Sequence, residues 1–149
     1  NESVYNNTDP NKNIFFEKIS TSINGFIHNK PIEFEIDIFS NEDVRNIHLG
    51  IGVQNLFNEN VVNRLLEKAI NISRGSNKFK IFISNHNLVP GEYKVVFGMA
   101  KDKTYDMLDA VIGSPGFTIF NDETDSMMLS KWNKTFGYHY LPDIIVKAE

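Results

Sequence analysis

The sequence predicts an all-β domain, an antiparallel β-sandwich of the jelly-roll or immunoglobulin-like type. Short stretches with apolar residues at alternate positions recur roughly every 8–14 residues, with turn residues between them. About seven to nine such stretches are present, which is typical of a sandwich. Twelve Phe and five Tyr against a single Trp also favour strands over helices.

Length and composition limit the function classes. The chain has 149 residues, of which 41% are hydrophobic and 23% charged, enough for one domain with a core. A net charge of −4 without a basic tract argues against a nucleic-acid partner. The absence of Cys excludes disulfides, thiolate zinc sites and a thiol nucleophile. Common catalytic motifs are missing and the four His are scattered without metal-ligand spacing, so we expect no cofactor and no metal.

The first element follows a polar, Asn-rich start. Residues 1–13 predict a linker or mobile lead-in, and residues 14–149 a single domain. The chain begins at Asn1 rather than Met, so we expect it to be excised from a longer protein. Residues 14–23 form a strand candidate that ends at a turn at Asn24-Gly25, and Phe26-Ile27 could extend the pairing.

Residues Pro31–Ser40 form the clearest strand, with one buried and one wet face. The buried face carries Ile32, Phe34, Ile36 and Ile38, and the wet face carries Glu33, Glu35, Asp37 and Phe39. Carboxylates two positions apart lie about 7 Å from each other on a strand. They could act as acid and base catalysts, but a solvated face is the expected reading because charged residues are mostly exposed.

The next strand, Ile47–Gln54, turns small residues outward. Ile47, Leu49, Ile51 and Val53 point inward, and His48, Gly50, Gly52 and Gln54 point outward. Residues 61–73 fit either a helical stripe through Leu65, Leu66, Ala69 and Ile72 or a strand at their end, and we favour the strand. Arg74–Asn77 predicts a turn, and Lys78–Ser84 predicts a further strand.

The stretch Leu88–Ala100 combines a turn at Pro90-Gly91 with a long strand. Tyr93, Val95, Phe97 and Met99 share its buried face, and Lys94, Val96, Gly98 and Ala100 share the other. If this strand lies near Ile47–Gln54, then Gly50, Gly52, Gly98 and Ala100 form a shallow floor rimmed by His48, Gln54 and Lys94. A lone His is more often structural than a ligand. Each rim residue can likewise be an ordinary surface residue.

The C-terminal third is less regular. Lys101–Ser114 shows no strand alternation, and Asp106–Val111 predicts a short helical turn. Pro115-Gly116 predicts a turn before a short strand over residues 116–120, and Asp122–Asp125 an acidic loop. Near Trp132, the aromatic group Tyr138-His139-Tyr140 suits a sugar-stacking platform or the edge packing of a terminal strand at residues 144–146.

Leu88–Asn121 resembles the C-terminal domain of Wzt proteins, the ATP-binding subunits of ABC transporters that export O-antigen polysaccharides. The resemblance rests on a turn and strand with Leu88, Gly91 and Tyr93, then on Tyr105-Asp106, then on Phe117-Thr118-Ile119. The strands at Pro31–Phe39 and at IHLGIGVQN, from Ile47, match the early strands of that domain in type. The similarity covers residues 15–121.

This resemblance implies a β-sandwich carbohydrate-binding module rather than an enzyme. Such a module recognises the modified non-reducing end of an O-antigen polysaccharide and couples it to export. The implied partners are the glycan, a nucleotide-binding domain that precedes Asn1 in the same chain, and the membrane subunit of the transporter. A homodimer with an exchanged terminal strand and a cytoplasmic location, peripheral to the inner membrane, are also implied.

The candidate glycan-binding residues combine the floor and its rim. They are His48, Gly50, Gly52, Gln54, Lys94, Gly98 and Lys101, with Glu35 and Asp37 as further candidates. Lys94 or His48 would suit an anionic terminal group. The alternative function is a structural or adhesive sandwich of a surface protein that binds another protein. A hydrolase that uses Glu33, Glu35 and Asp37 is a third reading.

Overall fold

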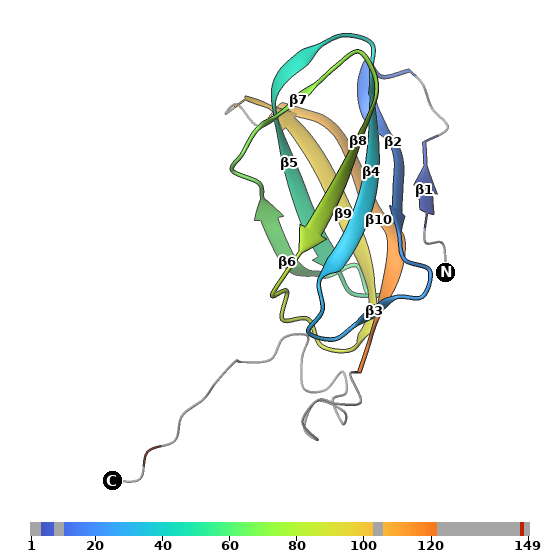
Figure 1. The fold of residues 1–149 in the computed structure, drawn as a ribbon, viewed down its shortest axis with the longest axis vertical. Helices are drawn as coiled ribbons and strands as arrows, with labels where there is room; N and C mark the ends of the chain where they lie inside the picture. Colours follow the sequence, from blue (N-terminus) through green and yellow to red (C-terminus); the bar gives the residue numbers. More distant parts are fainter. Residues whose placement is uncertain (1–3, 8–10, 103–105, 122–146, 148–149) are drawn as a thin grey trace.

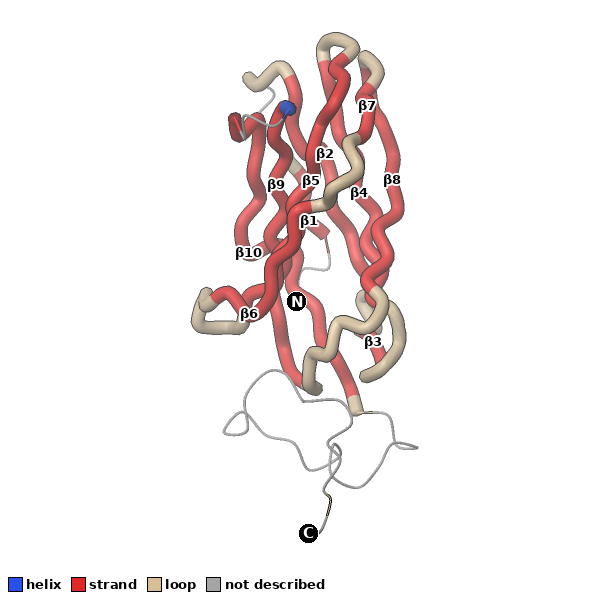
Figure 2. The backbone as a smooth tube through the Cα atoms, turned by 90° about the vertical axis from the view of Figure 1, so that its left-hand side faces the viewer, coloured by secondary structure: helices blue, strands red, loops and turns tan. Residues whose placement is uncertain are grey.

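The chain folds as a sandwich of two β-sheets. The structure is a computed structural model that describes residues 4–7, 11–102, 106–121 and 147. Ten strands and no α-helix occur in these residues, and none of their segments is a helix able to cross a membrane. Figures 1 and 2 show the two layers, with β9 and β10 in one and β4 and β8 in the other. The all-β sandwich predicted from the sequence is therefore confirmed.

Sheet A, the first layer, has the strand order β1-β2-β4-β8. Its strands are β1 (Val4–Asn6), β2 (Ile14–Thr21), β4 (Ile32–Ser40) and β8 (Gly75–Ile83). Every neighbouring pair is antiparallel. The predicted alternation of β4 is present, because Ile32, Phe34, Ile36 and Ile38 are fully buried.

Sheet B, the second layer, has the strand order β3-β10-β9-β5-β6, and β7 also pairs with β5. Its strands are β3 (Phe26–Ile27), β5 (Val44–Gln54), β6 (Asn60–Leu65), β7 (Ile70–Ile72), β9 (Gly91–Lys101) and β10 (Asp106–Phe120). The short β3 pairs with β10 in parallel, and the other pairs are antiparallel. Sheet B thus places the two glycine-bearing strands, β5 and β9, side by side.

The core lies between the inner faces of the two sheets and is rich in aromatic rings. Phe34 on β4 packs edge-on against Phe97 on β9 and Phe117 on β10, with ring centroids 5.5 Å and 5.6 Å away. Tyr93 stacks on Phe117 at 5.7 Å, and its hydroxyl donates to Val89 O at 2.6 Å. These contacts make β9 the centre of the core, as its strict alternation predicted.

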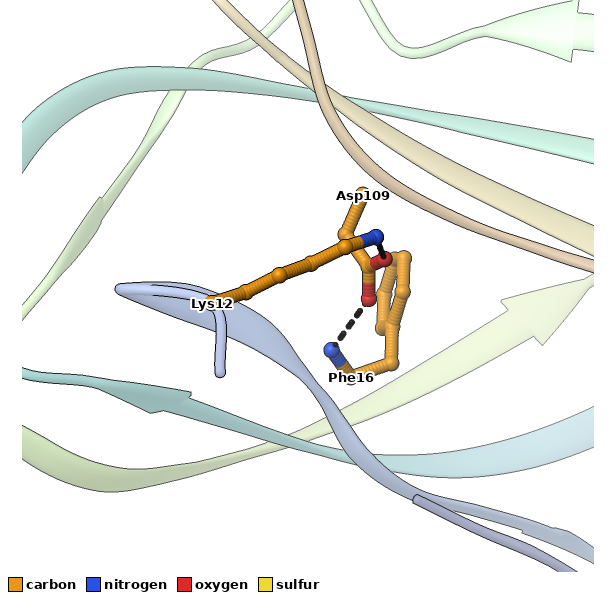
Figure 3. A network of polar contacts seen from close by, with 3 residues as sticks. All are labelled: Lys12, Phe16 and Asp109. Carbon is orange, nitrogen blue, oxygen red and sulfur yellow. Dashed lines mark hydrogen bonds and ion pairs between the residues drawn. The ribbon is translucent and has the colours of Figure 1, made fainter. Parts of the chain in front are cut away.

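A buried aspartate also joins the two sheets. Asp109 on β10 is only 5% exposed, and its Oδ2 accepts a hydrogen bond from the backbone N–H of Phe16 on β2 at 2.9 Å. Its Oδ1 meets Lys12 Nζ at 2.5 Å, and Figure 3 shows how these groups converge. The N–H of Phe16 stands at an irregularity in the β2–β4 register, so Asp109 satisfies a donor beside this break in the ladder.

Four sequence predictions about local structure were wrong, and one of them is the turn at Pro115-Gly116, which lies within strand β10. Residues 4–6, placed in the lead-in, form β1 and pair with β2. The turn predicted at Arg74–Asn77 overlaps the start of β8, which begins at Gly75. The helical turn predicted at Asp106–Val111 is strand β10, whose alternation is broken by register shifts at Met107/Asp109 and at Ile112/Gly116. Such irregularities conceal a strand from any period-2 pattern.

Residues 61–73 contain strands rather than a helix. They hold most of β6 and all of β7, which both pair with β5. The acidic loop at Asp122–Asp125, Trp132, the aromatic group at 138–140 and the predicted terminal strand at 144–146 lie outside the described residues. The division into residues 1–13 and 14–149 stays a prediction.

Candidate functional site

Six of the seven predicted site residues have the parity of the outer face of sheet B, although Gly52 and Gln54 are buried there. In the β5–β9 ladder, Gly50 stands directly opposite Gly98, and Gln54 stands opposite Lys94. His48 faces Ala100 at the other end of the same ladder. The expectation that the two strands are neighbours is thus confirmed, and a row of residues without large side chains crosses the sheet.

Lys101, the seventh residue, is not brought to this face. It pairs with the inward-pointing Ile47 at the end of β9, so it has the opposite parity to Gly98. Its side chain lines a separate hollow of about 470 Å³ with Arg45 and Asp102. The sequence analysis grouped Lys101 with the floor and its rim, and alternation along the strand turns its side chain away from them.

Strand β10 extends the small-residue floor. Ala110 pairs with Gly98 on the side away from Gly50 and is exposed. Two large apolar side chains of β10 flank it, Met107 at 64% and Ile112 at 71% exposure. Sequence reasoning missed all three because it did not read residues 106–112 as a strand.

The floor is not an open trough at its centre. A Cβ built on Gly98 would lie 3.5 Å from Met107 Sδ, and one on Gly50 would lie 3.8 Å from Leu65 Cδ1. The glycines therefore let neighbouring side chains lie flat over the backbone. Both overlying side chains remain partly exposed, so the centre of this face is a shallow apolar surface.

A deeper hollow opens where β10 bulges. From the pair Ile112–Val96 to the pair Gly116–Lys94, β10 advances by four residues while β9 advances by two. The extra residues bend β10 away and leave a pocket of about 230 Å³. We call it the bulge pocket, and its lining includes Leu56, Glu92, Lys94, Gly113, Ser114 and Thr118.

Two predicted residues reach the bulge pocket or its rear. Lys94 lines it, and its Nζ donates to Asn58 Oδ1 at 3.0 Å. Gln54 lies behind it, 8% exposed, and its Nε2 donates to Asn60 Oδ1 at 3.1 Å. Within the part of the chain that the structure describes, Gln54 Oε1 is buried and accepts no hydrogen bond.

His48 has a structural contact at the far end of the face. Its half-buried ring places Nδ1 3.4 Å from the carbonyl oxygen of Leu66. This contact lies about two strand residues beyond Gly50 and away from the bulge pocket. The structure therefore brings Lys94 and Gln54 together and keeps His48 apart from them.

The outer face of sheet A differs in chemistry. Lys80 Nζ lies 3.3 Å from both Glu33 Oε1 and Glu35 Oε1, and Lys78 Nζ lies 3.7 Å from Asp37 Oδ2. The carboxylates are thus paired with cations across the β4–β8 ladder, on the sheet opposite to the glycine floor. In the described residues, no group of three or more His, Asp or Glu side chains could hold a metal ion.

Comparison with known proteins identifies the fold. The structure matches the crystal structure of the C-terminal domain of Wzt with a TM-score of 0.68 and 15% identity, over 97% of this chain and 87% of that one. The chain has the fold of the Wzt C-terminal domain. At this identity the match establishes the fold alone, and it confirms the fold that the resemblance in Leu88–Asn121 implied.

Other comparisons add less. Bacteroides uniformis β-glucuronidase 2, in a covalent complex with cyclophellitol-6-carboxylate aziridine, matches with a TM-score of 0.42 and 16% identity. That match covers 73% of this chain and 14% of the glucuronidase. No protein-family description and no curated protein matches the sequence.

Proposed function

We propose that the chain is a non-catalytic carbohydrate-binding module and that its outer sheet B face binds a polysaccharide. The observation that carries this proposal is the difference between the two outer faces. Sheet A presents paired charges, whereas sheet B presents a floor of Gly50, Gly98 and Ala110 beneath exposed apolar side chains. Exposed apolar side chains do not help a protein to stay in solution, so this surface is suited to contact with a partner.

A glycan fits this surface physically. Sugar rings combine apolar C–H faces with a rim of hydroxyls, so they need a flat apolar strip beside a few hydrogen-bonding groups. The floor and Met107 supply the strip, and Lys94, Ser114 and Thr118 supply polar groups at one end. A ring laid on this strip would rest on the side chains of Met107 and Leu65, which lie over Gly98 and Gly50.

The carboxylates of sheet A support a non-catalytic role. Glu33 and Glu35 share Lys80, and all three side chains are substantially exposed. A catalytic carboxylate pair needs a partly enclosed site with distinct environments for acid and base, whereas these two side chains lie in the open and share one cation. The hydrolase reading therefore has no support in their geometry.

We further propose that the glycan is an O-antigen polysaccharide, recognised at its modified non-reducing end for export. Support comes from the shared fold with the Wzt C-terminal domain. In this proposal a nucleotide-binding domain of the same chain and the membrane subunit of an ABC transporter are partners. The module would then act in the cytoplasm, peripheral to the inner membrane.

A homodimer with an exchanged terminal strand is the proposed assembly. In the described residues, β8 ends sheet A and β6 ends sheet B, so each has one side without a paired strand. A cleft of about 370 Å³ lies between these edges, lined by Ile51, Val62, Phe82 and Ile83 among others. An added strand would cover this apolar cleft. Light scattering should give twice the 17.1 kDa chain mass, and a monomer at all concentrations would rule the exchange out.

A protein partner is the second candidate function. The exposed side chains of Met107, Ile112 and Leu65 on one flat face also suit an adhesive sandwich domain. The parent gene separates the two readings, because a Walker A motif upstream supports export and a secretion signal supports a surface protein.

The direct test is a glycan array followed by titration with surface polysaccharide from the organism that carries the gene. The proposal predicts saturable binding that is weak to moderate and specific for one glycan. Absence of binding to the array and to that polysaccharide would contradict it.

A further inference from the structure

We infer that the bulge pocket is a subsite for one neutral sugar unit, held between Lys94 and Glu92 and completed by the buried Gln54. This inference rests on the proposed function and assigns a place and a chemistry to the ligand. The pocket is distinct from the glycine floor, because neither Gly50 nor Gly98 lines it.

The buried amide of Gln54 is the first argument. Its Oε1 accepts no hydrogen bond within the described residues, and a buried acceptor without a donor is destabilising. The atom lies 3.8 Å from where a Cβ on Gly113 would stand, and Gly113 lines the pocket. A hydroxyl that enters beside Gly113 can donate to it, and Gly113 leaves the space that any side chain would fill.

The net charge of the pocket is the second argument. Lys94 and Glu92 project from the same face of β9, two residues apart, and both line the pocket. One cation and one anion cancel, and the Lys94 ammonium already contacts Asn58. An acidic sugar would gain attraction from Lys94 and meet repulsion from Glu92. The hydroxyls of a neutral sugar can accept a hydrogen bond from the Lys94 ammonium and donate one to the Glu92 carboxylate.

The rigidity of the pocket wall is the third argument. Leu56 and Asn58 belong to the β5–β6 loop, which is held by the buried side chain of Asn55. Asn55 Oδ1 accepts from the N–H groups of Phe57 and Glu59 at 2.9 Å and 3.0 Å, and its Nδ2 donates to Glu59 Oε2 at 2.5 Å. A wall that is already ordered loses little entropy when a ligand binds.

The test uses the full chain and a matched pair of substitutions on β9. Lys94→Met removes the ammonium from the pocket and keeps the alkyl stem, and Lys101→Met makes the same change at the other end of the strand. Binding is measured on an array of neutral and uronic-acid glycans, then by titration with the neutral glycan that binds best. Lys94→Met should weaken binding at least tenfold and Lys101→Met less than twofold.

A second pair of variants distinguishes loss of binding from loss of folded protein. Thr118→Val removes a pocket hydroxyl without a change of shape and should weaken binding severalfold. Gln54→Met removes the buried amide, and its unfolding midpoint is measured beside its affinity, because only a loss of affinity in folded protein counts.

The outcomes separate this inference from the proposed function. Equal effects of Lys94→Met and Lys101→Met would overturn the subsite and leave a glycan-binding protein. Binding to uronic-acid glycans alone would overturn the neutral sugar. Absence of binding by the unsubstituted chain to the array and to polysaccharide from the source organism would overturn the proposed function and the subsite with it.

Discussion

The two outer faces of the sandwich are both exposed to solvent, yet they present different kinds of side chain. On sheet A, Glu33, Glu35 and Asp37 pair with lysines of β8, and the exposed Phe82 lies at the end of this charged row. On sheet B, the corresponding central positions hold Gly50, Gly98 and Ala110. Under the proposed function, this difference separates a solvated face on sheet A from a ligand-binding face on sheet B.

The strongest way to break this comparison is to place a charge on the glycine floor. In Gly98→Glu the new Cβ meets only Met107 at ordinary van der Waals distance, so the fold should persist. The carboxylate would occupy the surface offered to the sugar, and glycan affinity should fall at least tenfold in a titration. Lys78→Glu on sheet A, 80% exposed at present, is the control and should leave affinity unchanged. Equal losses would mean that the faces do not differ in function.

A second prediction concerns the contact that holds the two sheets together. Asp109→Ala removes the acceptor of the buried Phe16 N–H and should destabilise the fold by about 1–3 kcal/mol in urea unfolding. Lys12→Met keeps that hydrogen bond, and because Lys12 is 57% exposed its ion pair is screened by water. Its effect should be clearly smaller. A larger effect of Lys12→Met would show that the ion pair, rather than the backbone contact, joins the sheets.

A smaller effect is expected from Tyr5, which lies near the same aspartate. Burial raises the pKa of Tyr5 above its ordinary value of 10.0, Asp109 raises it further, and Lys12 lowers it. A folded-state pKa above the unfolded one means that Tyr5 stabilises the fold below pH 10 and that this contribution is lost as pH rises through the folded pKa. Absorbance titration of the chain against Tyr5→Phe should give a phenol pKa above 10.0, and Asp109→Asn should lower it.

The smallest effect is predicted for the charge ladder of sheet A. Hydrogen bonds to Glu35 and then Glu33 raise the pKa of Lys80 above its ordinary value of 10.5. The sign of linkage places any stabilisation below pH 10.5, with loss at higher pH. Because Lys80 is exposed, Lys80→Met should leave the thermal midpoint at pH 7 unchanged within error. A clear decrease at pH 7 would mean that sheet A relies on its charges for more than solubility.

Much of the fold could be predicted from the sequence where alternation is strict. In β4, in β9 from Tyr93 to Met99 and in β5 from Ile47 to Ile51, buried residues alternate with more exposed ones, and the pleat converts that order directly into a face. In β10 the register shifts break the alternation, so this strand resembled a helical turn and a separate short strand. The early β1 was missed because a three-residue edge strand carries too little pattern.

The candidate site could be predicted only in part for the same reason. Gly50, Gly98, Gln54 and Lys94 lie on strands with clear parity, and they do share one face. Ala110, Ser114 and Thr118 come from the irregular β10, and the bulge pocket depends on a distortion at Gly113, Pro115 and Gly116 that the sequence pattern presented as a turn between two elements. Lys101 is the opposite case: it was included in the site, but its side chain points to the other side of the sheet from its neighbour Ala100.

The central claim is that the ligand contacts sheet B, and one measurement tests it most directly. Backbone amide chemical shifts of the full chain are recorded while surface polysaccharide from the source organism is added. The account predicts shifts confined to β5, β9 and β10, largest around Gly98, Lys94 and Gly113. Shifts concentrated on β4 and β8, around Glu35 and Lys80, would contradict it.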